Sequence, residues 1–406
     1  FKKDHRPFDF SKGHFLGKSM SEVFKSWIDD KNKRSLVYQL LTLIIVVYIG
    51  MFFFNNTVHN LQKQKIASGW DFLTQEAGFP IGEGVVEYTP ADSYRHALWV
   101  GFLNTIKVAL IGNFLAVILG TIIGVARLSK NWLVSRLSLC YIESLRNVPL
   151  LLQLFFWYTV ITDILPIVRK ALKPFPGVFL SNRGLVFPIP KPDPVFEMMG
   201  WAFLVGVLLI FLVIHLGKKY QDKTGRSLPV IRISLGLIVG LPLLMWVIGG
   251  APTALDIPKQ GRFNFSGGYT FSPEIMALLL GLVLYTGAFI AEVVRAGILS
   301  VKKGQTEAAM SLGLKPHQVL RLVTFPQALR VIVPPLTSQL LNLTKNSSLA
   351  VAIGYPDFVS VNNTTLNQTG QAVECIFLII VLYLSTSLIT SVFMNWYNKN
   401  IALVER

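Results

Sequence analysis

Four ionisable side chains stand as two acid–base pairs inside long apolar stretches. Arg146 follows Glu143 by three residues, and Arg295 follows Glu292 by the same interval. Charged side chains are costly within a membrane and usually face a bundle interior or a pathway. Residues three apart share one face of a helix, so each pair can neutralise itself, or the acid can bind a cationic group and the base an anionic one. Both roles stay open, and all four residues are candidate binding residues.

Neutral polar side chains in the same apolar stretches are further candidates for contact with a ligand. They are Gln153, Tyr285, Asn342 and Ser348. Lys345 differs from them, because it lies late in its stretch, where its long side chain can extend to the outer membrane interface. We favour that position over a role in a pathway.

The sequence has no pattern typical of an enzyme or a metal site. Its six histidines show no HExxH spacing, its two cysteines form no CxxC pair, and no GxSxG motif occurs. Residues 13–19 come nearest to a phosphate-binding loop, but their two glycines are separated by three residues and not four. We therefore expect no catalytic residue, no metal site and no cofactor bound by this chain.

Composition places the chain in a membrane. Of its 406 residues, 52% are hydrophobic and 15% are charged, against about 25% charged in an average soluble protein. The formal net charge of +16 could suggest nucleic acid, but the basic residues lie at the ends of apolar stretches and form no continuous stripe. Lipid contact is expected, and a nucleic-acid partner is not.

Apolar stretches of about 20 residues can cross a bilayer only as helices, because lipid offers the backbone no hydrogen bonds. The sequence suggests eight, at 35–55, 97–126, 137–165, 198–217, 230–250, 274–300, 330–353 and 374–396. This predicts an all-α, polytopic membrane protein with about eight transmembrane helices. With both termini in the cytoplasm, most loop lysines and arginines lie on the cytoplasmic side. The 166–197 loop departs from that bias, and its prolines predict an extended, irregular connection.

Residues 304–336 form a long connection with a helical pattern on each side of a break. Glu307–Ala309 are helix formers, Gly313 stands where that helix would end, and Pro316 can open the next one. Pro326 is expected to break the run before the next span. The pattern predicts a helix–turn–helix elbow on the cytoplasmic face. It either fits a groove on another protein and transmits force, or lies at the interface as an amphipathic helix.

The residues of this elbow resemble the coupling-loop signature of permeases in binding-protein-dependent ABC importers. The matching positions are Glu307, Ala308, Ala309, Gly313 and Pro326. Residues 143–151 (ESLRNVPLL) are similar to the E-x-x-R-x-x-P-L-L run of polar amino-acid permeases. Residues 285–297 (YTGAFIAEVVRAG) are similar to the helix that precedes their coupling loop. The resemblance covers about 97–165 and 274–396 and implies a type I ABC importer permease core.

The chain adds an N-terminal helix and an insertion with two helices to the usual five-span core, as in the larger permease subunits of general L-amino-acid importers. The resemblance implies six segments. They are a cytoplasmic tail (1–34), an anchor helix with an external loop (35–96), a first core part (97–165), the insertion (166–272), a second core part with coupling loop 301–330 (273–396), and a cytoplasmic tail (397–406).

The resemblance also implies partners in a bacterial inner membrane. They are a second, related but non-identical permease, two ATPase subunits that hold ATP and Mg, and a periplasmic or extracellular substrate-binding protein. An amino-acid substrate is a zwitterion, so Glu143 and Glu292 could bind its ammonium, and Arg146 and Arg295 its carboxylate. The chain would transport and not catalyse. The rival interpretation is an ion-coupled secondary transporter or channel, which needs neither an ATPase nor such an elbow.

Overall fold

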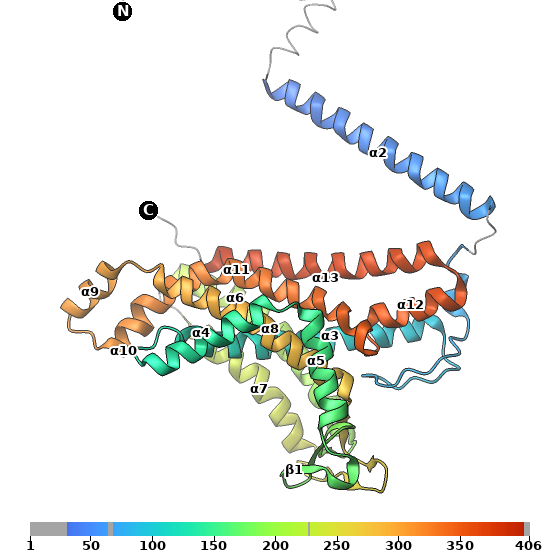
Figure 1. The fold of residues 1–406 in the computed structure, drawn as a ribbon. Coiled ribbons are helices and arrows are strands. Elements are labelled where there is room, and N and C mark those ends of the chain that lie inside the picture. Colours follow the sequence, from blue (N-terminus) through green and yellow to red (C-terminus); the bar gives the residue numbers. More distant parts are fainter. Residues whose placement is uncertain (1–30, 64–67, 226–227, 402–406) are drawn as a thin grey trace, which may run out of the picture. The chain divides into compact units, whose positions relative to one another are not determined.

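The computed structural model describes residues 31–63, 68–225 and 228–401, in which helices predominate (Figure 1). Six described helices are long and apolar enough to cross a membrane, or seven if one bent pair counts as a single span, and Arg232–Ile248 is a shorter apolar helix. The prediction of an all-α polytopic protein with about eight spans is therefore confirmed in outline. Most of the two expected tails and the glycine-containing stretch 13–19 lie outside the described residues.

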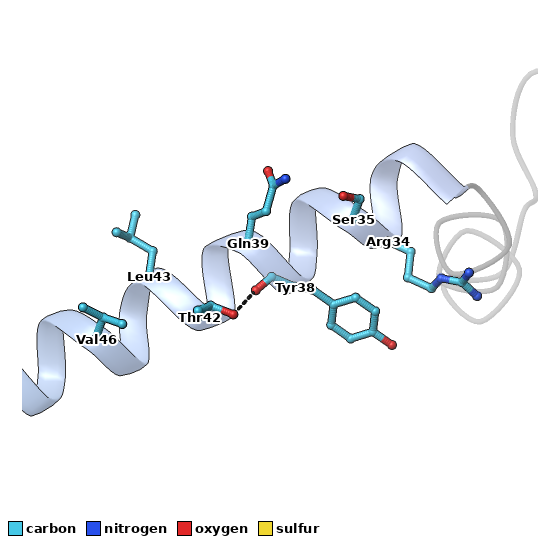
Figure 2. Close-up of a pocket in the computed structure, with 7 residues that line it drawn as sticks. All are labelled: Arg34, Ser35, Tyr38, Gln39, Thr42, Leu43 and Val46. Carbon is cyan, nitrogen blue, oxygen red and sulfur yellow. Dashed lines mark hydrogen bonds between the residues drawn. The ribbon is translucent and has the colours of Figure 1, made fainter. Parts of the chain in front are cut away.

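The chain divides into two units, residues 1–69 with 369–372, and residues 70–368 with 373–406. Helix α2 (Lys31–Lys63) belongs to the first unit, and its apolar side chains from Leu36 to Phe54 are exposed. The hollow in Figure 2 is lined by this helix alone, where the Thr42 hydroxyl donates to the Tyr38 carbonyl at 2.8 Å. A hollow on one helix encloses no ligand. A helix that is apolar all round is typical of a membrane span.

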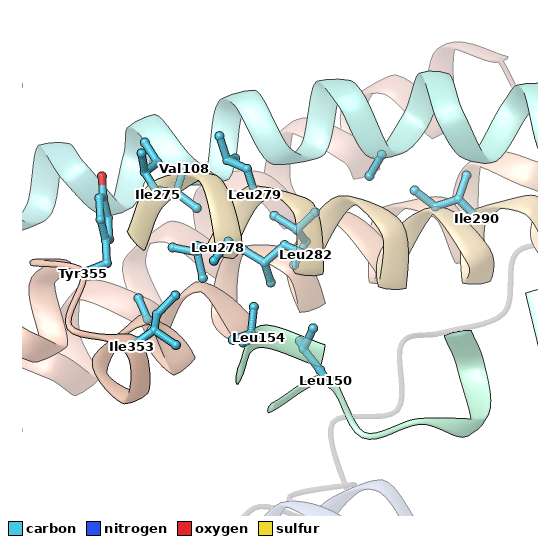
Figure 3. Packing of buried hydrophobic residues seen from close by; sticks show 14 of the residues in the cluster. Val108, Leu150, Leu154, Ile275, Leu278, Leu279, Leu282, Ile290, Ile353 and Tyr355 are labelled. Carbon is cyan, nitrogen blue, oxygen red and sulfur yellow. The ribbon is translucent and has the colours of Figure 1, made fainter. Parts of the chain in front are cut away.

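Helices α3 (Tyr94–Ala126) and α8 (Pro273–Leu299) form the centre of the second unit. The most apolar window of α8 is 67% buried within the chain, against 33% for α3, so α8 is the helix around which the others pack. Figure 3 shows Leu278 and Leu282 of α8 packed with Leu154. Small residues bring α3 close, because a Cβ at Gly120 would stand only 2.6 Å from the Ile290 Cβ.

The stretch 137–165 is a bent pair of helices and not one span. Helix α4 (Trp132–Asn147) and helix α5 (Leu150–Thr159), which continues into a π turn (Val160–Ile164), meet at 104°. Pro149 causes the break, because its ring disfavours the helical conformation at the preceding residue. Val148 is accordingly extended, with φ −100° and ψ 128°.

The insertion contains two long helices and a small sheet. Helices α6 (Pro194–Thr224) and α7 (Val230–Ile248) pack against each other. An antiparallel sheet has the order β1-β2-β3-β8, and β4–β5 and β6–β7 form two further pairs. The strands are β1 (Leu172–Phe175), β2 (Val178–Ser181), β3 (Gly184–Phe187), β4 (Ile189–Pro190), β5 (Leu255–Asp256), β6 (Lys259–Gln260), β7 (Phe265–Ser266) and β8 (Tyr269–Phe271). The proline-rich loop is therefore extended but not irregular, because the far end of the insertion supplies its strand partners.

The C-terminal part begins with the elbow, helices α9 (Lys303–Ser311) and α10 (Pro316–Val319). Helix α11 (Phe325–Asn346), a 3-10 turn (Ser347–Ile353), and helices α12 (Phe358–Thr369) and α13 (Ala372–Ile401) follow.

The expected break at Pro326 does not occur. Helix α10 runs through a π turn (Leu320–Thr324) into α11, and Pro326 lies in the first turn of α11. A proline ring clashes with the carbonyl four residues earlier, and the wider π turn relieves that clash.

Candidate functional site: a coupling elbow and two polar clusters

The elbow turns at Gly313, which has the left-handed φ of +81°. The Gly313 amide donates to the Met310 carbonyl at 2.9 Å, and the Leu314 amide to the Ala309 carbonyl at 3.3 Å. These two bonds form the Schellman motif that ends many helices at a glycine. The predicted helix–turn–helix is therefore present, with Pro316 in the first turn of α10.

The elbow exposes one acidic and several apolar side chains. Glu307, Ala308 and Leu312 are exposed, with Leu312 84% accessible, whereas Ala309 is buried against the residues that follow the turn. Gln327 Nε2 donates to Gln305 Oε1 at 3.4 Å and ties α11 to α9. In Figure 1 the elbow stands at one end of the helices of its unit, and α12 lies at the other. It is thus a short, braced projection with an exposed apolar surface.

Glu292 and Arg295 form an ion pair with each other on α8. Arg295 Nε donates to Glu292 Oε2 at 3.0 Å, and a second donor of the guanidinium reaches Glu292 Oε1. Both side chains are about one third exposed. Of the two roles that the sequence left open, self-neutralisation is the one adopted in this conformation.

The other pair is not arranged in that way. The Arg146 guanidinium lies 5.0 Å from the centre of the Phe289 ring, and that ring lies 5.0 Å from Tyr285. Glu143 is exposed. Arg146 of α4 and Tyr285 of α8 therefore both lie against the Phe289 ring, one helical turn from Glu292. We name Arg146, Tyr285, Phe289, Glu292 and Arg295 the α4–α8 cluster.

Gln153 has a structural use at the bend between α4 and α5. Its side chain is buried, and Nε2 donates to the Leu145 and Val148 carbonyl oxygens at 2.9 Å each. A helix end leaves carbonyl groups without intrahelical partners, and Gln153 satisfies two of them where α4 stops. Its amide donors are therefore committed to the backbone.

A cavity of about 510 Å³ lies beside Lys345 and Ser348, within the size range of small-molecule sites. Residues from α5, α11, the 3-10 turn, α12 and α13 line it: Leu151, Lys345, Ser348, Leu349, Val351, Ala352, Val359, Ile379 and Tyr383. Lys345 thus shares a cavity wall with a candidate residue. Asn342 lies one turn earlier on α11 and is exposed. We name this space the Lys345 cavity.

Two polar residues near these clusters escaped the sequence analysis. Tyr383 lines the Lys345 cavity from α13. Asp357 is fully buried, and its Oδ1 accepts from the Ser360 amide at 2.9 Å at the start of α12. Burial raises the pKa of Asp357 to about 7, although backbone amides oppose that shift. An aspartate directly before a helix is a capping signal and could have located Asp357. Tyr383 offered no comparable signal.

A third polar group joins α3 to segments far away in the sequence. Lys107 pairs with Glu83, which also accepts from the Ser272 hydroxyl at 2.8 Å. Asn104 Nδ2 donates to the Glu83 and Pro356 carbonyl oxygens at 2.8 and 2.9 Å. Within residues 31–63, 68–225 and 228–401, no three His, Cys, Asp or Glu side chains gather to hold a metal ion. The bonds of Lys107, Glu83 and Asn104 thus join α3 to the segments around residues 83, 272 and 356.

The sequence has close relatives among known transport proteins. Residues 223–403 match the family described as "Binding-protein-dependent transport system inner membrane component". The chain is 47% identical to the general L-amino acid transport system permease protein AapQ of Rhizobium johnstonii, covering 94% of this chain and 96% of that protein. It is 48% identical to the putative amino-acid ABC transporter permease protein YhdX of Escherichia coli, covering 92% and 95%.

A third relative is the glutamate/glutamine/aspartate/asparagine transport system permease protein BztB of Rhodobacter capsulatus, at 40% identity over 93% of this chain and 96% of that protein. Identity at this level over nearly the whole length, with the elbow geometry and the membrane spans, establishes the family. The chain belongs to the binding-protein-dependent transport system inner membrane components and is a multi-pass permease subunit of an amino-acid ABC importer.

Proposed function

We propose that this chain forms half of the translocation pathway for L-amino acids and that ATPase subunits move it through the elbow of α9 and α10. The observation that carries this proposal is the Schellman turn at Gly313, which sets Glu307 and Leu312 outward on a braced projection. A rigid helix with an exposed apolar surface can fit a groove and transmit displacement to α11. The coupling residues are Glu307, Ala308, Ala309, Gly313 and Pro326.

The remaining subunits follow from this role. Two ATPase subunits would bind ATP and Mg and grip the elbow from the cytoplasm, where both termini would also lie. A second, related permease would complete the pathway, and a substrate-binding protein would deliver the amino acid from outside. To shift the transporter strongly between two conformations, ATP must favour one of them by several kcal/mol.

The substrate is an L-amino acid, in keeping with the names of the AapQ and BztB relatives. Its carboxylate would bind Arg146 or Arg295, and Ser348 would be a neutral contact from the wall of the Lys345 cavity. Its ammonium would bind Glu143 or Glu292. Glu292 is now paired with Arg295, so a ligand that uses it must open that pair. Gln153, Tyr285 and Asn342 complete the candidate set as neutral contacts.

The test is ATP-dependent amino-acid uptake by the reconstituted transporter, with its ATPases and each candidate binding protein. Glu307→Lys should abolish uptake while the complex still assembles, because the exposed carboxylate lies on the face offered to the ATPase. Glu76→Lys, the same change at an exposed position in the 70–93 segment, is the matched control. If the isolated chain carried amino acids down an ion gradient without ATPase, the secondary-transporter interpretation would replace this one.

A further inference from the structure

Two arginines of the insertion flank one exposed aromatic ring. The Arg169 and Arg262 guanidinium groups lie 5.6 and 5.4 Å from the centre of the Phe263 ring. Phe263 is 73% exposed, and both arginines are exposed as well. We name these three residues the arginine tip. Arg169 and Phe263 are 94 positions apart in the sequence, near opposite ends of the insertion, and yet they form one surface feature.

The arginine tip is held in place by contacts between the two ends of the insertion. Gln260 Nε2 donates to the Val168 carbonyl at 2.6 Å, and Arg169 Nε donates to the Arg262 carbonyl at 3.4 Å. Phe265 of β7 packs on Phe179 of β2 with ring centres 5.1 Å apart. The ring and both cations are thus positioned before any partner arrives, which lowers the entropy that binding costs.

Positive charge on this part of the insertion has almost no internal compensation. The cations of 166–192 and 249–272 are Arg169, Lys170, Lys173, Arg183, Lys191, Lys259 and Arg262, and Asp256 is the only acidic residue there. Asp256 Oδ2 already accepts from the Gly268 amide at 2.8 Å. Two like charges on one ring repel each other, and an anionic partner that fits between them would relieve that repulsion.

We propose that the arginine tip docks an acidic surface of the substrate-binding protein, an inference that rests on the proposed import function. Arginine and aromatic residues dominate the energetic centres of protein interfaces. A free amino acid fits this feature poorly, because a ring that is 73% exposed forms no concave pocket.

An anionic membrane surface fits less well than an acidic protein. Membrane-interface belts use tryptophan and tyrosine, and the segments 166–192 and 249–272 contain no tryptophan and Tyr269 alone among tyrosines. Lysine and arginine are usually enriched in cytoplasmic loops, so a cationic external loop departs from that rule. An acidic binding partner outside the membrane gives a physical reason for cations on that side.

The first experiment uses the complete transporter in vesicles with the amino-acid-binding protein that stimulates its ATPase activity. The double variant Arg169→Glu/Arg262→Glu should raise the binding-protein concentration for half-maximal stimulation about tenfold or more, with basal ATPase activity unchanged. Arg183→Glu/Lys191→Glu makes the same net charge change at two exposed positions outside the arginine tip. This control should change the half-maximal binding-protein concentration less than about threefold. Equal changes of the half-maximal concentration in both double variants would overturn the proposal, since binding would then depend only on the overall charge of the insertion.

A second pair of variants separates the ring from the charges. Phe263→Ser should raise the half-maximal concentration several-fold, whereas Phe175→Ser, at a ring of β1 that is 70% exposed, should leave it unchanged. If the arginine variant instead altered basal activity only in vesicles containing phosphatidylglycerol, the surface would bind lipid and the proposal would be wrong. If no binding protein stimulated the parent complex, the import function itself would fail, and this inference with it.

Discussion

Lys107 and Glu83 form an ion pair that is almost fully buried, with side chains 13% and 11% exposed. The Lys107 ammonium also lies 5.8 Å from the centre of the Tyr355 ring and 3.4 Å from the Tyr269 hydroxyl. One pair thereby joins α3, the segment before it, the last strand of the sheet and the segment before α12. It is one of the contacts that fix the insertion to the permease core, beside the packing of β3 and β8 on α8.

Removing one partner of this pair should cost more than removing both. Lys107→Met leaves the Glu83 carboxylate buried without its cation, and we expect a loss of about 3–5 kcal/mol of stability. The double variant Lys107→Met/Glu83→Gln should recover much of that loss, because no uncompensated charge remains. Thermal unfolding of the detergent-solubilised protein measures both. A double variant less stable than the single one would refute this account.

Gly120 should tolerate no branched side chain. A Cβ there would stand 2.6 Å from the Ile290 Cβ and 2.8 Å from the Gly287 carbonyl oxygen, and a backbone atom cannot move aside cheaply. Gly120→Val should therefore separate α3 from α8 and destabilise the protein by about 2–3 kcal/mol. Gly240→Val on α7, where nothing lies within 4 Å, is the control. Monodispersity and apparent melting temperature in detergent report the difference, and equal values for the two variants would argue against tight packing.

Gly313 should be needed for its backbone conformation and not for space. A Cβ at this position would meet nothing within 4 Å, yet φ is +81°, a conformation that costs a non-glycine residue about 1–2 kcal/mol. Gly313→Val should thus loosen the turn and lower ATP-dependent uptake several-fold with little change in expression. Gly304→Ala, in open space within α9, should preserve uptake. Full activity of the Gly313 variant would show that coupling does not need this turn.

Asp357 should make stability depend on pH. Burial raises its pKa from an ordinary 3.8 to about 7, so the folded state keeps a proton that the unfolded state has lost. The contribution of Asp357 to stability is therefore fully present below about pH 4 and is lost as pH rises toward 7, by on the order of a few kcal/mol.

Asp357→Asn removes that ionisation and should flatten the profile, so the variant gains stability relative to the parent between pH 5 and pH 8. Apparent melting temperatures at the two values provide the measurement, with Asp71→Asn at an exposed position as the control. A parent-like slope in the Asp357 variant would contradict the assignment.

Local rules account for what could be predicted of the elbow. Helix formers at Glu307–Ala309, a glycine at 313 and a proline at 316 each act within one helical turn, and the structure contains the helix, the turn and the second helix. The same local rule failed at Pro326, because whether a proline breaks a helix depends on the turn before it, and a π turn accepts it. The apolar stretch 137–165 was predicted as one span, but Pro149 divides it into two helices that meet at 104°.

The sequence by itself determined that the chain lies in a membrane, roughly how many helices cross it, and which family it belongs to, because hydropathy and motif spacing act over short distances. Only the tertiary structure decided that Glu292 pairs with Arg295, that Gln153 satisfies carbonyl groups at a bend, and that Lys345 and Ser348 share a cavity with Tyr383. It also brought Arg169 beside Phe263 and Lys107 beside Glu83. The contacts of Arg169 with Phe263 and of Lys107 with Glu83 join residues that are distant in the chain, and the packing of whole helices and strands fixes them, so no local pattern encodes them. The three-residue spacing of Glu292 and Arg295 allowed their pair but could not decide it, because the surrounding helices determine whether either side chain has another partner.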